Sequence, residues 1–599
     1  MGNFNLAHSR IRALVLFTAL IIFLFGVRLI QIQAIQAGDY RLKAFDEMEK
    51  LNTLQAPRGD ITDIHGVAFA RSVAAISIVV DQTQILNPSK VAELTAPILG
   101  LEVAEVELSL TGTRKWSMVA RNAKPATWLK LTEAIATYNA QYEPISPERI
   151  VGFFPERSYI REYPSGHLIA SLVGFVNHEG IGATGLESSM NSKISGVNGK
   201  YSYANGYKAE IPGSQSEIIP AQTGTSVRLT VDRDIQWVAS KAIAKAVKSS
   251  AALSGTVIVM DPKTGHILAH ATAPTFDPNN TKKVSLIAMR NPSVQDVYEP
   301  GSIGKIMTLA AALEEKKITP ETVLTVPYKL KRSDKVFSDH EPHPTQRLTT
   351  SGVLAVSSNT GSILIGEMLP NQSLYDYLTK FGIGIKTGAG LPGESRGKLL
   401  QVGDWSGTTA PTVAFGQGYS LNAMQATSIF ATIANDGVRV PPTVIAGTSD
   451  ASGNYTPTKR AESVRVVSAT TAKQMRLMME TVVSANGTAP TAAINGYRVA
   501  GKTGTAQRID DTCGCYRGYT ASFIGFAPAD QPAYVINVTI QDPKGMHWGG
   551  ALAGPVFKEV MSFVLQSQGV VPTQDKIKKV ALNEAQLLAQ NKVIRVKTN

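Results

Sequence analysis

A run of apolar residues near the start of the chain predicts a membrane-spanning helix. Residues 13–27 are uncharged, and apolar positions continue to Ile32, so the run approaches the ~20 residues that a spanning helix needs. No later segment offers a second stretch of about 18 consecutive apolar residues. We therefore expect a single transmembrane anchor over residues 13–33.

The residues that flank this run predict its orientation. Arg10 and Arg12 precede it, and no acidic residue occurs before Asp39. Basic flanks stay on the cytoplasmic side of a membrane, so we expect a cytoplasmic tail over residues 1–12 and the bulk of the chain outside. A cleavable signal peptide is the alternative. The residues after the run lack the small side chains of a cleavage site, which favours an uncleaved anchor.

Beyond the anchor, the hydrophobic pattern divides the chain into two folded domains. Residues 38–224 are rich in turns and short apolar stretches, without a dominant amphipathic helix, which indicates an elongated, strand-containing pedestal. The pattern then changes, because residues 226–231 alternate as in a strand and residues 232–250 carry apolar side chains at helical spacing. We therefore predict a second domain over residues 226–570.

The second domain is predicted to contain an antiparallel sheet with helices packed on it. Five segments have the residue pattern of strands: 255–260, 266–270, 498–505, 520–526 and 534–540. Mostly helical patterns lie between the first two and the last three, so we predict an α+β fold. The remaining tail, residues 571–599, is polar and basic and is either a helix or disordered.

The amino-acid composition argues against several classes of protein. With 43% hydrophobic residues, 50 Gly and 31 Pro, the 599-residue chain is globular material rather than a disordered protein. Its net charge of +12 suits an anionic partner, but no basic run interleaved with aromatic residues occurs, so we expect no nucleic acid. The nine histidines include no His-Glu-x-x-His pair, and we expect neither a metal nor another cofactor.

The two cysteines leave an alternative open. Cys513 and Cys515 are the only cysteines in the chain, which excludes a disulfide framework and a four-cysteine zinc site. A Cys-x-Cys pair either closes a strained disulfide in an oxidising compartment or remains two thiols. The sequence does not decide between these states.

Ser302 and Lys305 form the first motif that carries chemistry. Pro300 and Gly301 precede a run of good helix formers, which places Ser302 near a helix N-terminus, where free N–H groups favour negative charge. The spacing of three puts Ser302 and Lys305 on one helical face. A lysine kept neutral by burial can remove the proton of a serine hydroxyl and activate it as a nucleophile. Alone, this Ser-x-x-Lys motif is a weak signal.

Two further motifs strengthen the interpretation. Ser357-Ser358-Asn359 and Lys502-Thr-Gly504 follow in the order that is typical of class A β-lactamases and penicillin-binding proteins. The middle motif there is Ser-Asp-Asn, and here Ser358 replaces the aspartate while Ser357 and Asn359 are retained. By themselves, the serines suit a helix cap, and the asparagine a turn, better than a catalytic role. The joint occurrence of all three motifs favours the catalytic interpretation.

A second Lys-Thr-Gly sequence competes for the third position. The residues around Lys386 are punctuated by glycine and have the pattern of a loop. The residues before Lys502 have the pattern of a strand, and a strand edge allows an extended peptide to pair along it. We therefore assign the third motif to Lys502.

On these motifs, the chain resembles the class B penicillin-binding proteins, and most closely the division-type (FtsI-like) transpeptidases. The resemblance extends from residue 10 to near residue 565. In the pedestal it rests on residues 58–66, 161–164, 174–176 and 182–187. In the second domain it also includes residues 229–232, 298–302, 415–418 and 521–526. It implies a pedestal of the penicillin-binding-protein dimerisation type, followed by a transpeptidase domain.

The resemblance implies a catalytic role for four residues. Ser302 attacks the carbonyl of the penultimate D-Ala of a peptidoglycan stem peptide, which releases the terminal D-Ala and leaves an acyl-enzyme. Lys305 takes the serine proton, and Ser357 relays a proton to the leaving amine. Asn359 orients Lys305 and the acyl chain. An amine of a neighbouring stem peptide then completes the cross-link, and β-lactams enter the same path.

The third motif is expected to bind substrate. By resemblance, Lys502 and the hydroxyls of Thr503 and Thr505 hold the terminal carboxylate of the stem peptide. Gly504 has no side chain and lets the backbone approach the ligand. The backbone N–H groups of Ser302 and Thr505 are expected to form the oxyanion hole.

The resemblance also implies partners and a location. A polytopic SEDS-type glycosyltransferase and other division proteins are expected partners, because the pedestal does not resemble a glycosyltransferase module. The protein is expected in the cell membrane as a single-pass protein with a cytoplasmic N-terminus and an extracytoplasmic catalytic domain. Alternatives to a septal role are an elongation-type transpeptidase, a β-lactamase or β-lactam sensor on the same fold, and a catalytically silent scaffold.

Overall fold

The computed structural model describes residues 4–40, 49–206, 209–210, 217–510, 513, 515–573 and 579–597. The chain folds into two compact units, and each unit combines segments that are far apart in the sequence. The first unit comprises Met1–Pro57, Ala74–Tyr159 and Gly196–Thr223. The second unit comprises Arg58–Val73, Ile160–Ser195 and Gly224–Asn599. Two segments of the predicted pedestal range therefore pack within the second unit.

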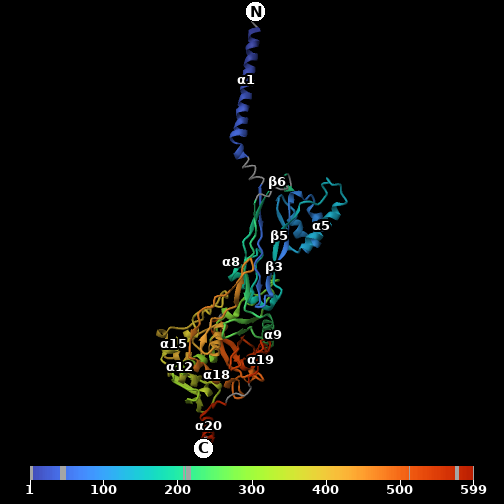
Figure 1. Ribbon diagram of the computed structural model, residues 1–599. Coiled ribbons are helices and arrows are strands. Elements are labelled where there is room, and N and C mark those ends of the chain that lie inside the picture. Colours follow the sequence, from blue (N-terminus) through green and yellow to red (C-terminus); the bar gives the residue numbers. More distant parts are fainter. Residues whose placement is uncertain are drawn as a thin grey trace. The chain divides into compact units, whose positions relative to one another are not determined.

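The apolar helix expected near the N-terminus is α1 (Phe4–Ile30), drawn in dark blue in Figure 1. It continues as a short π-helix, η1 (Gln31–Ile35). The mean hydropathy reaches 2.6 within Ser9–Ile35, and this segment is long and apolar enough to cross a membrane. Among the residues that the structure describes, no second helix meets these criteria.

Three helices of the first unit pack on a small hydrophobic core. They are α3 (Pro88–Leu99), α4 (Val103–Leu110) and α5 (Pro125–Asn139). The side chain of Asn87 caps the start of α3 by accepting a hydrogen bond from Lys90 N, and Gly100 ends the helix with a φ of 67°. The sequence pattern did not indicate these helices. In α5 only Leu131 and Asn139 are buried, so its apolar periodicity is weak.

The strands of the first unit agree with the prediction of a strand-containing pedestal. β1 (Glu49–Leu54) pairs with β6 (Gly199–Gly206), which also pairs with β7 (Ala209–Glu210) and β8 (Glu217–Ile219). The second half of β3 (Ala68–Val80) pairs with β4 (Ser117–Ala123), and β3 also pairs with β5 (Phe153–Glu162).

The second unit is built on a five-stranded antiparallel sheet with the order β11-β10-β22-β21-β20. Its strands are β10 (Ser254–Met260), β11 (Ile267–Ala273), β20 (Ala500–Asp510), β21 (Cys515–Ala527) and β22 (Tyr534–Gln541). They overlap the five predicted segments, and the predicted α+β fold with an antiparallel sheet is confirmed. Every residue of β10 is buried, as expected for a central strand that is covered on both faces.

Helices cover both faces of this sheet: α9 (Arg233–Ser249) and α19 (Gly549–Ser567) lie on one, and α17 (Ala423–Ala434) lies on the other. Phe523 of β21 contacts Phe557 of α19, with ring centroids 4.8 Å apart. On the opposite face, Asn537 of β22 donates a hydrogen bond to the carbonyl of Ala423 in α17 at 2.8 Å. α18 (Ala469–Val483) packs against β20 and α17.

Shorter elements complete the second unit. Its minor strands are β2 (Ile61–Thr62), β9 (Ser226–Leu229), β12 (Val323–Val326), β13 (Lys329–Arg332), β14 (Lys335–Ser338), β15 (Gln346–Thr349), β16 (Val438–Arg439), β17 (Ile445–Ser449), β18 (Tyr455–Pro457) and β19 (Val464–Arg465). Its other helices are α6 (Ala170–Val173), α7 (Gly185–Ser189), α8 (Asn191–Ile194), α10 (Leu286–Met289), α11 (Pro292–Gln295), α12 (Lys305–Glu314), α13 (Thr350–Ala355), α14 (Asn359–Gly366), α15 (Asn371–Lys380), α16 (Thr409–Ala414) and α20 (Glu584–Lys597). The predicted motifs lie between the 3₁₀ turn η4 (Gly301–Ile303), which precedes α12, and β20.

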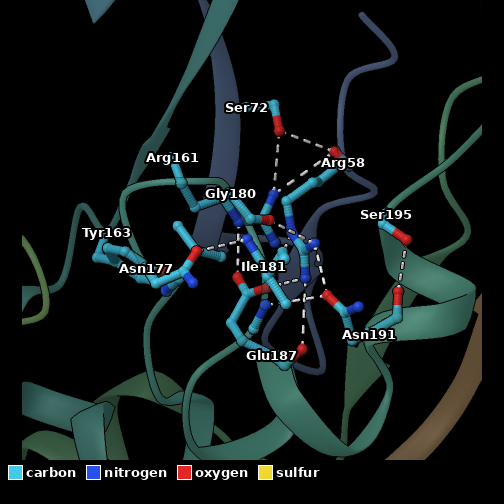
Figure 2. Close-up of polar contacts among 12 residues, drawn as sticks. Arg58, Ser72, Arg161, Tyr163, Asn177, Gly180, Ile181, Glu187, Asn191 and Ser195 are labelled. Carbon is cyan, nitrogen blue, oxygen red and sulfur yellow. Dashed lines mark hydrogen bonds and ion pairs between the residues drawn. The ribbon is translucent and has the colours of Figure 1, made fainter. Parts of the chain in front are cut away.

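A buried ion-pair cluster joins distant segments of the second unit (Figure 2). Arg58 Nη2 lies 2.7 Å from one carboxylate oxygen of Glu187, and Arg161 Nε lies 2.6 Å from the other. Arg58 also donates to the carbonyl of Gly180 at 3.0 Å and to Asn191 Oδ1 at 2.9 Å. The Glu187 side chain is fully buried, and both arginines are nearly so. The predicted pedestal motifs that contain Arg58, Arg161 and Glu187 therefore hold these segments together through buried ion pairs and hydrogen bonds.

The C-terminal segment is folded against the second unit. The backbone N–H of Thr349 donates to the carbonyl of Leu582 at 3.1 Å, and its hydroxyl donates to the carbonyl of Ala581 at 2.7 Å. Arg347 forms an ion pair with Glu584 at 2.9 Å. Of the two alternatives for the tail, its described C-terminal part is a helix, α20.

Candidate active site

Ser302 lies in a tight turn between two glycines. The 3₁₀ turn η4 (Gly301–Ile303) contains it and leads directly into α12, whose first residue is Lys305. Gly301 has a φ of 54°, and a Cβ there would lie only 3.1 Å from the Cβ of Ala506 in β20. Glycine at this position therefore allows the turn to pack closely on β20. Ser302 is half-buried, so its side chain is partly accessible to solvent.

The second motif meets Ser302 and Lys305 at a strained turn. Ser357, between α13 and α14, has a φ of 60°, which is uncommon for a residue with a side chain. Its hydroxyl donates to Ser302 Oγ at 2.9 Å. Lys305 Nζ donates to Ser357 Oγ at 3.2 Å, to Asn359 Oδ1 at 2.8 Å and to the carbonyl oxygen of Ser357. Such backbone conformations cluster at functional sites, where the surroundings hold them in place.

Lys502 approaches the same serine from β20. Its Nζ donates to Ser357 Oγ at 2.9 Å and to the carbonyl of Thr503 at 3.2 Å. Ser357 Oγ thus accepts from two lysines and donates to Ser302, which is the full capacity of a hydroxyl group. Ser357 Oγ therefore lies between Ser302 and the two lysines, in hydrogen-bond contact with all three.

Burial prepares both lysines for proton transfer. Lys305 and Lys502 are completely buried. Burial lowers the pKa of Lys305 to about 7, although the negative charge of Asp339 opposes this change. Burial, together with the positive charge of Lys305, also lowers the pKa of Lys502 well below its usual value. A substantial fraction of Lys305 is therefore neutral near pH 7 and able to accept a proton.

The remaining residues of the third motif line the same strand. A Cβ at Gly504 would lie 2.4 Å from Ser522 Oγ and 2.9 Å from Ile303, so only glycine fits between β21 and the turn of the nucleophile. The hydroxyl of Thr503 lies 2.7 Å from that of Thr488. Thr505 Oγ1 accepts a hydrogen bond from the N–H of the residue that starts α19, at 3.2 Å.

The competing Lys-Thr-Gly sequence lies apart from these contacts. Lys386 is exposed, in a loop after α15. Thr387 donates through both its N–H and its hydroxyl to Glu394 Oε1 at 2.6 Å, which closes the loop on itself. The structure thus brings together Ser302, Lys305, Ser357, Asn359 and Lys502, and it does not add Lys386 to them.

Asp339 is a contact of the site that the sequence reasoning missed. It follows β14, and its carboxylate accepts hydrogen bonds from Ser358 Oγ at 2.6 Å, from the N–H of Asn359 at 2.5 Å and from the N–H of Thr360 at 2.9 Å. It therefore caps the N-terminus of α14, where negative charge is favourable. No local pattern marks Asp339, because its partners lie about twenty positions later and on another element.

A row of four aromatic rings borders the site. Tyr519 of β21 stacks on His547 with ring centroids 4.1 Å apart, and His547 contacts Trp548 at 4.6 Å. Trp548 in turn contacts His340 edge-to-face at 4.5 Å. The backbone N–H that follows Trp548 bonds to Thr505, whereas His340 belongs to the loop behind the second motif. The row therefore connects the two sides of the site.

The cysteine pair is oxidised in this structure. Cys513 and Cys515 form a disulfide in the hairpin between β20 and β21. The next residue, Tyr516, donates through its hydroxyl to Glu299 Oε2 at 3.2 Å. Glu299 precedes the nucleophile turn and also accepts a hydrogen bond from the N–H of Gly418 at 2.9 Å. The hairpin is thus connected to the segment that positions Ser302.

Comparison with known proteins agrees with this geometry. Residues 255–562 match the family model of the penicillin binding protein transpeptidase domain, and residues 53–229 match that of the penicillin-binding protein dimerisation domain. The penicillin-binding protein PbpB of Mycolicibacterium smegmatis is 34% identical, over 92% of this chain and 89% of the relative. The chain belongs to the class B penicillin-binding proteins.

Other members of this class are similar along most of their length. The crystal structure of penicillin-binding protein 3 from Mycobacterium tuberculosis, complexed with aztreonam, has a TM-score of 0.69 and 31% identity to this class B penicillin-binding protein. The similarity covers 89% of this chain and 100% of that chain. The peptidoglycan D,D-transpeptidase FtsI of Escherichia coli is 29% identical, over 87% of this chain and 86% of the relative. The family expected from the motifs is therefore confirmed.

Proposed function

We propose that this class B penicillin-binding protein is a peptidoglycan D,D-transpeptidase that works through an acyl-enzyme on Ser302. The observation that carries the proposal is the hydrogen-bonded group in which Ser357 Oγ connects Ser302 to both Lys305 and Lys502. A serine hydroxyl needs a base to become a nucleophile, and a buried lysine with a pKa of about 7 supplies one.

The first half of the reaction uses the two lysines and Ser357. Neutral Lys305 removes the proton of Ser302, either directly or through Ser357, as Ser302 Oγ attacks the carbonyl carbon of the penultimate D-Ala. The carbon–nitrogen bond to the terminal D-Ala then breaks, and Ser357 delivers a proton to the departing amine. Asn359 holds Lys305 through the hydrogen bond to Oδ1 at 2.8 Å. Deacylation repeats these steps with the amine of a second stem peptide as the nucleophile.

Substrate positioning falls to β20 in this proposal. Lys502 and the hydroxyls of Thr503 and Thr505 hold the terminal carboxylate. Gly504 leaves room for the backbone of the ligand to approach the strand. The backbone N–H groups of Ser302 and Thr505 stabilise the oxyanion, and each such donor contributes about 3–4 kcal/mol in acyl-transfer sites. The close packing of the nucleophile turn on β20 supports this pairing of donors.

Mass spectrometry of the full-length protein after incubation with a penicillin tests the proposal. We expect one covalent acyl group, on Ser302, and no adduct in Ser302→Ala. A thermal melt of the variant checks that the fold is retained. Acylation that persists in Ser302→Ala, or that maps to Ser357, refutes the assignment. An adduct that water removes within seconds indicates a β-lactamase instead.

A septal role in the cell membrane completes the proposal. The relative FtsI and the basic residues in α1 support a single-pass protein with a cytoplasmic N-terminus and an extracytoplasmic catalytic domain. The expected partners are a SEDS-type glycosyltransferase and other division proteins. Gln31, Gln33 and Gln36 near the end of the anchor suit hydrogen bonds to a neighbouring helix, although an interfacial stalk suits them equally.

The division of labour between polymerase and transpeptidase has a direct test. Purified full-length protein is supplied with lipid-linked disaccharide pentapeptide, and the products are analysed for glycan chains. We expect no polymer until a SEDS-type glycosyltransferase is added. Glycan polymer formed by this protein alone contradicts the proposed partnership.

A further inference from the structure

His343 completes the contacts around Asp339, behind the second motif. Its Nε2 lies 3.0 Å from Asp339 Oδ2, and its Nδ1 lies 2.7 Å from the carbonyl oxygen of Pro344. A carboxylate and a carbonyl oxygen accept hydrogen bonds and donate none. Both ring nitrogens must therefore carry a proton for both contacts to be hydrogen bonds. The geometry fits the positively charged imidazolium form.

The immediate surroundings of His343 favour this charge. Burial lowers the pKa of His343, but the hydrogen bonds to Pro344 and Asp339 and the charge of Asp339 outweigh burial, so the pKa is raised above its usual value. The Asp339 side chain is 9% exposed and that of His343 is 16% exposed, so water screens their interaction only in part.

Other titratable groups face the ring from neighbouring elements. Tyr328, which precedes β13, contacts His343 edge-to-face with ring centroids 5.7 Å apart. The ammonium of Lys329 lies 5.6 Å from the centre of the Tyr328 ring. His340 and Glu341 are exposed on the same loop as His343. Among the described residues, Asp339 is the carboxylate that forms an ion pair with His343.

We propose that His343 is a positioning residue of the transpeptidase, which holds Asp339 against the Ser357–Asn359 turn and offsets the charge of Asp339 at Lys305. This role rests on the proposed function. His343 does not touch the substrate in the proposed mechanism. It acts through Asp339, which binds the backbone N–H of Asn359 and the hydroxyl of Ser358.

The electrostatic part of this role has a definite sign. The negative charge of Asp339 raises the pKa of Lys305 against the larger lowering by burial. A positive charge on His343 partly neutralises Asp339, so its removal strengthens the field at Lys305 and raises the pKa of Lys305. Less Lys305 is then neutral at a given pH. Acylation, which needs neutral Lys305, should therefore require a higher pH.

Acylation rates of full-length variants across pH 5.5–9 test the proposal. In His343→Gln, which removes the charge, we expect the rising limb of the profile to move up by about half a pH unit. This shift makes acylation about threefold slower at pH 6, with recovery towards the wild-type rate at pH 9. In His343→Arg, which keeps a charge beside Asp339, the midpoint should stay close to that of the wild type.

A matched control and a prior condition make the result decisive. His178→Gln applies the same substitution to an exposed histidine of the second unit and should leave the profile unchanged. An unshifted midpoint in His343→Gln, with or without an equal loss of rate at every pH, overturns the proposal. If only one of the two His343 variants folds, its midpoint alone decides the test. A shifted midpoint in His343→Gln, or an unshifted midpoint in His343→Arg, supports the proposal, and the opposite result overturns it. Absence of Ser302 acylation in the wild type refutes the proposed function instead.

Discussion

The second unit contains two clusters of buried charge that are satisfied in opposite ways. At Glu187, one carboxylate receives both Arg58 and Arg161, so each buried guanidinium has an anionic partner. At the active site, Lys305 and Lys502 are completely buried, and within the part of the chain that the structure describes neither forms an ion pair. The first arrangement keeps its side chains charged. The second lowers the pKa of both lysines and so favours their neutral form.

This difference separates a structural cluster from the one that we propose to be catalytic. A buried charge without a partner is unfavourable, and a lysine relieves the cost by losing its proton. Arginine cannot do so, because its pKa stays above any ordinary pH. The use of arginine in one cluster and lysine in the other therefore follows from their functions. Four measurements test this distinction.

Removal of either active-site lysine should have the largest effect. In Lys305→Ala the general base is lost, and in Lys502→Ala the second donor to Ser357 is lost. We expect acylation by penicillin to slow by about 10²–10⁴-fold, the usual contribution of a general base or acid. Rapid-quench measurement with intact-mass detection gives the rates. A variant that acylates at the wild-type rate shows that its lysine has no part in proton transfer.

Removal of the charge of Glu187, which pairs with Arg58 and Arg161, should lower the stability of the protein without changing the acylation rate. Glu187→Gln leaves two buried guanidiniums without an anion, and loss of one partner from a buried ion pair costs about 3–5 kcal/mol in the free energy of unfolding. Urea unfolding measures the loss, and Glu179→Gln, an exposed neighbour, is the control. Protein that remains folded should acylate at a near-normal rate. A large loss of acylation with unchanged stability would reverse the roles of the two clusters.

The pH dependence of acylation should report Lys305. Burial lowers the pKa of Lys305 to about 7, and its neutral form is the base in the proposed mechanism. The acylation rate should therefore rise about tenfold per unit below pH 7 and level off above it. Pre-steady-state rates with a penicillin that does not titrate in this range provide the profile. A rate that falls as the pH rises through 7 excludes neutral Lys305 as the base.

The smallest effect is expected at the second Lys-Thr-Gly sequence. Lys386 is exposed in a loop that Thr387 and Glu394 close, apart from the contacts of Ser302. Lys386→Ala should keep the acylation rate within about tenfold of the wild type, which corresponds to ~1.4 kcal/mol of barrier. The same assay on Lys502→Ala provides the contrast. The reverse ranking of the two variants would show that the third motif was assigned to the wrong lysine.

The sequence predicted what depends on neighbouring residues. The five strands of the main sheet were found because each has a compact apolar or alternating pattern, and β22 was placed within one residue at each end. The three motifs were recognised by their resemblance to a known set, and the structure brings their side chains together at Ser357 Oγ. The predicted ends were wrong for three strands. β11 continues to Ala273, and β20 and β21 continue into the polar residues of their hairpin, where each strand supplies the other's hydrogen bonds.

What the sequence did not reveal depends on contacts between distant residues. Arg58 and Glu187 are 129 positions apart, and no spacing within either segment indicates that they share a buried site. Asp339 reaches Asn359 from a loop that has neither helical nor strand periodicity. The effect of Asp339 on the pKa of Lys305 could not be predicted either, because it arises from the interaction of two charges that are far apart in the sequence. Such contacts emerge only once the loops are placed in three dimensions.

The docked C-terminal segment has a consequence for how the protein is made. Thr349, at the start of the helix that leads to Ser357, binds the carbonyls of Ala581 and Leu582, and a Cβ at Gly352 would lie 1.8 Å from the oxygen of Leu582. These contacts cannot form until residues 581 and 582 have left the ribosome. A chain that is still being synthesised before that point therefore lacks one support of its Ser357 turn, and the turn gains this support only when the C-terminal segment has docked.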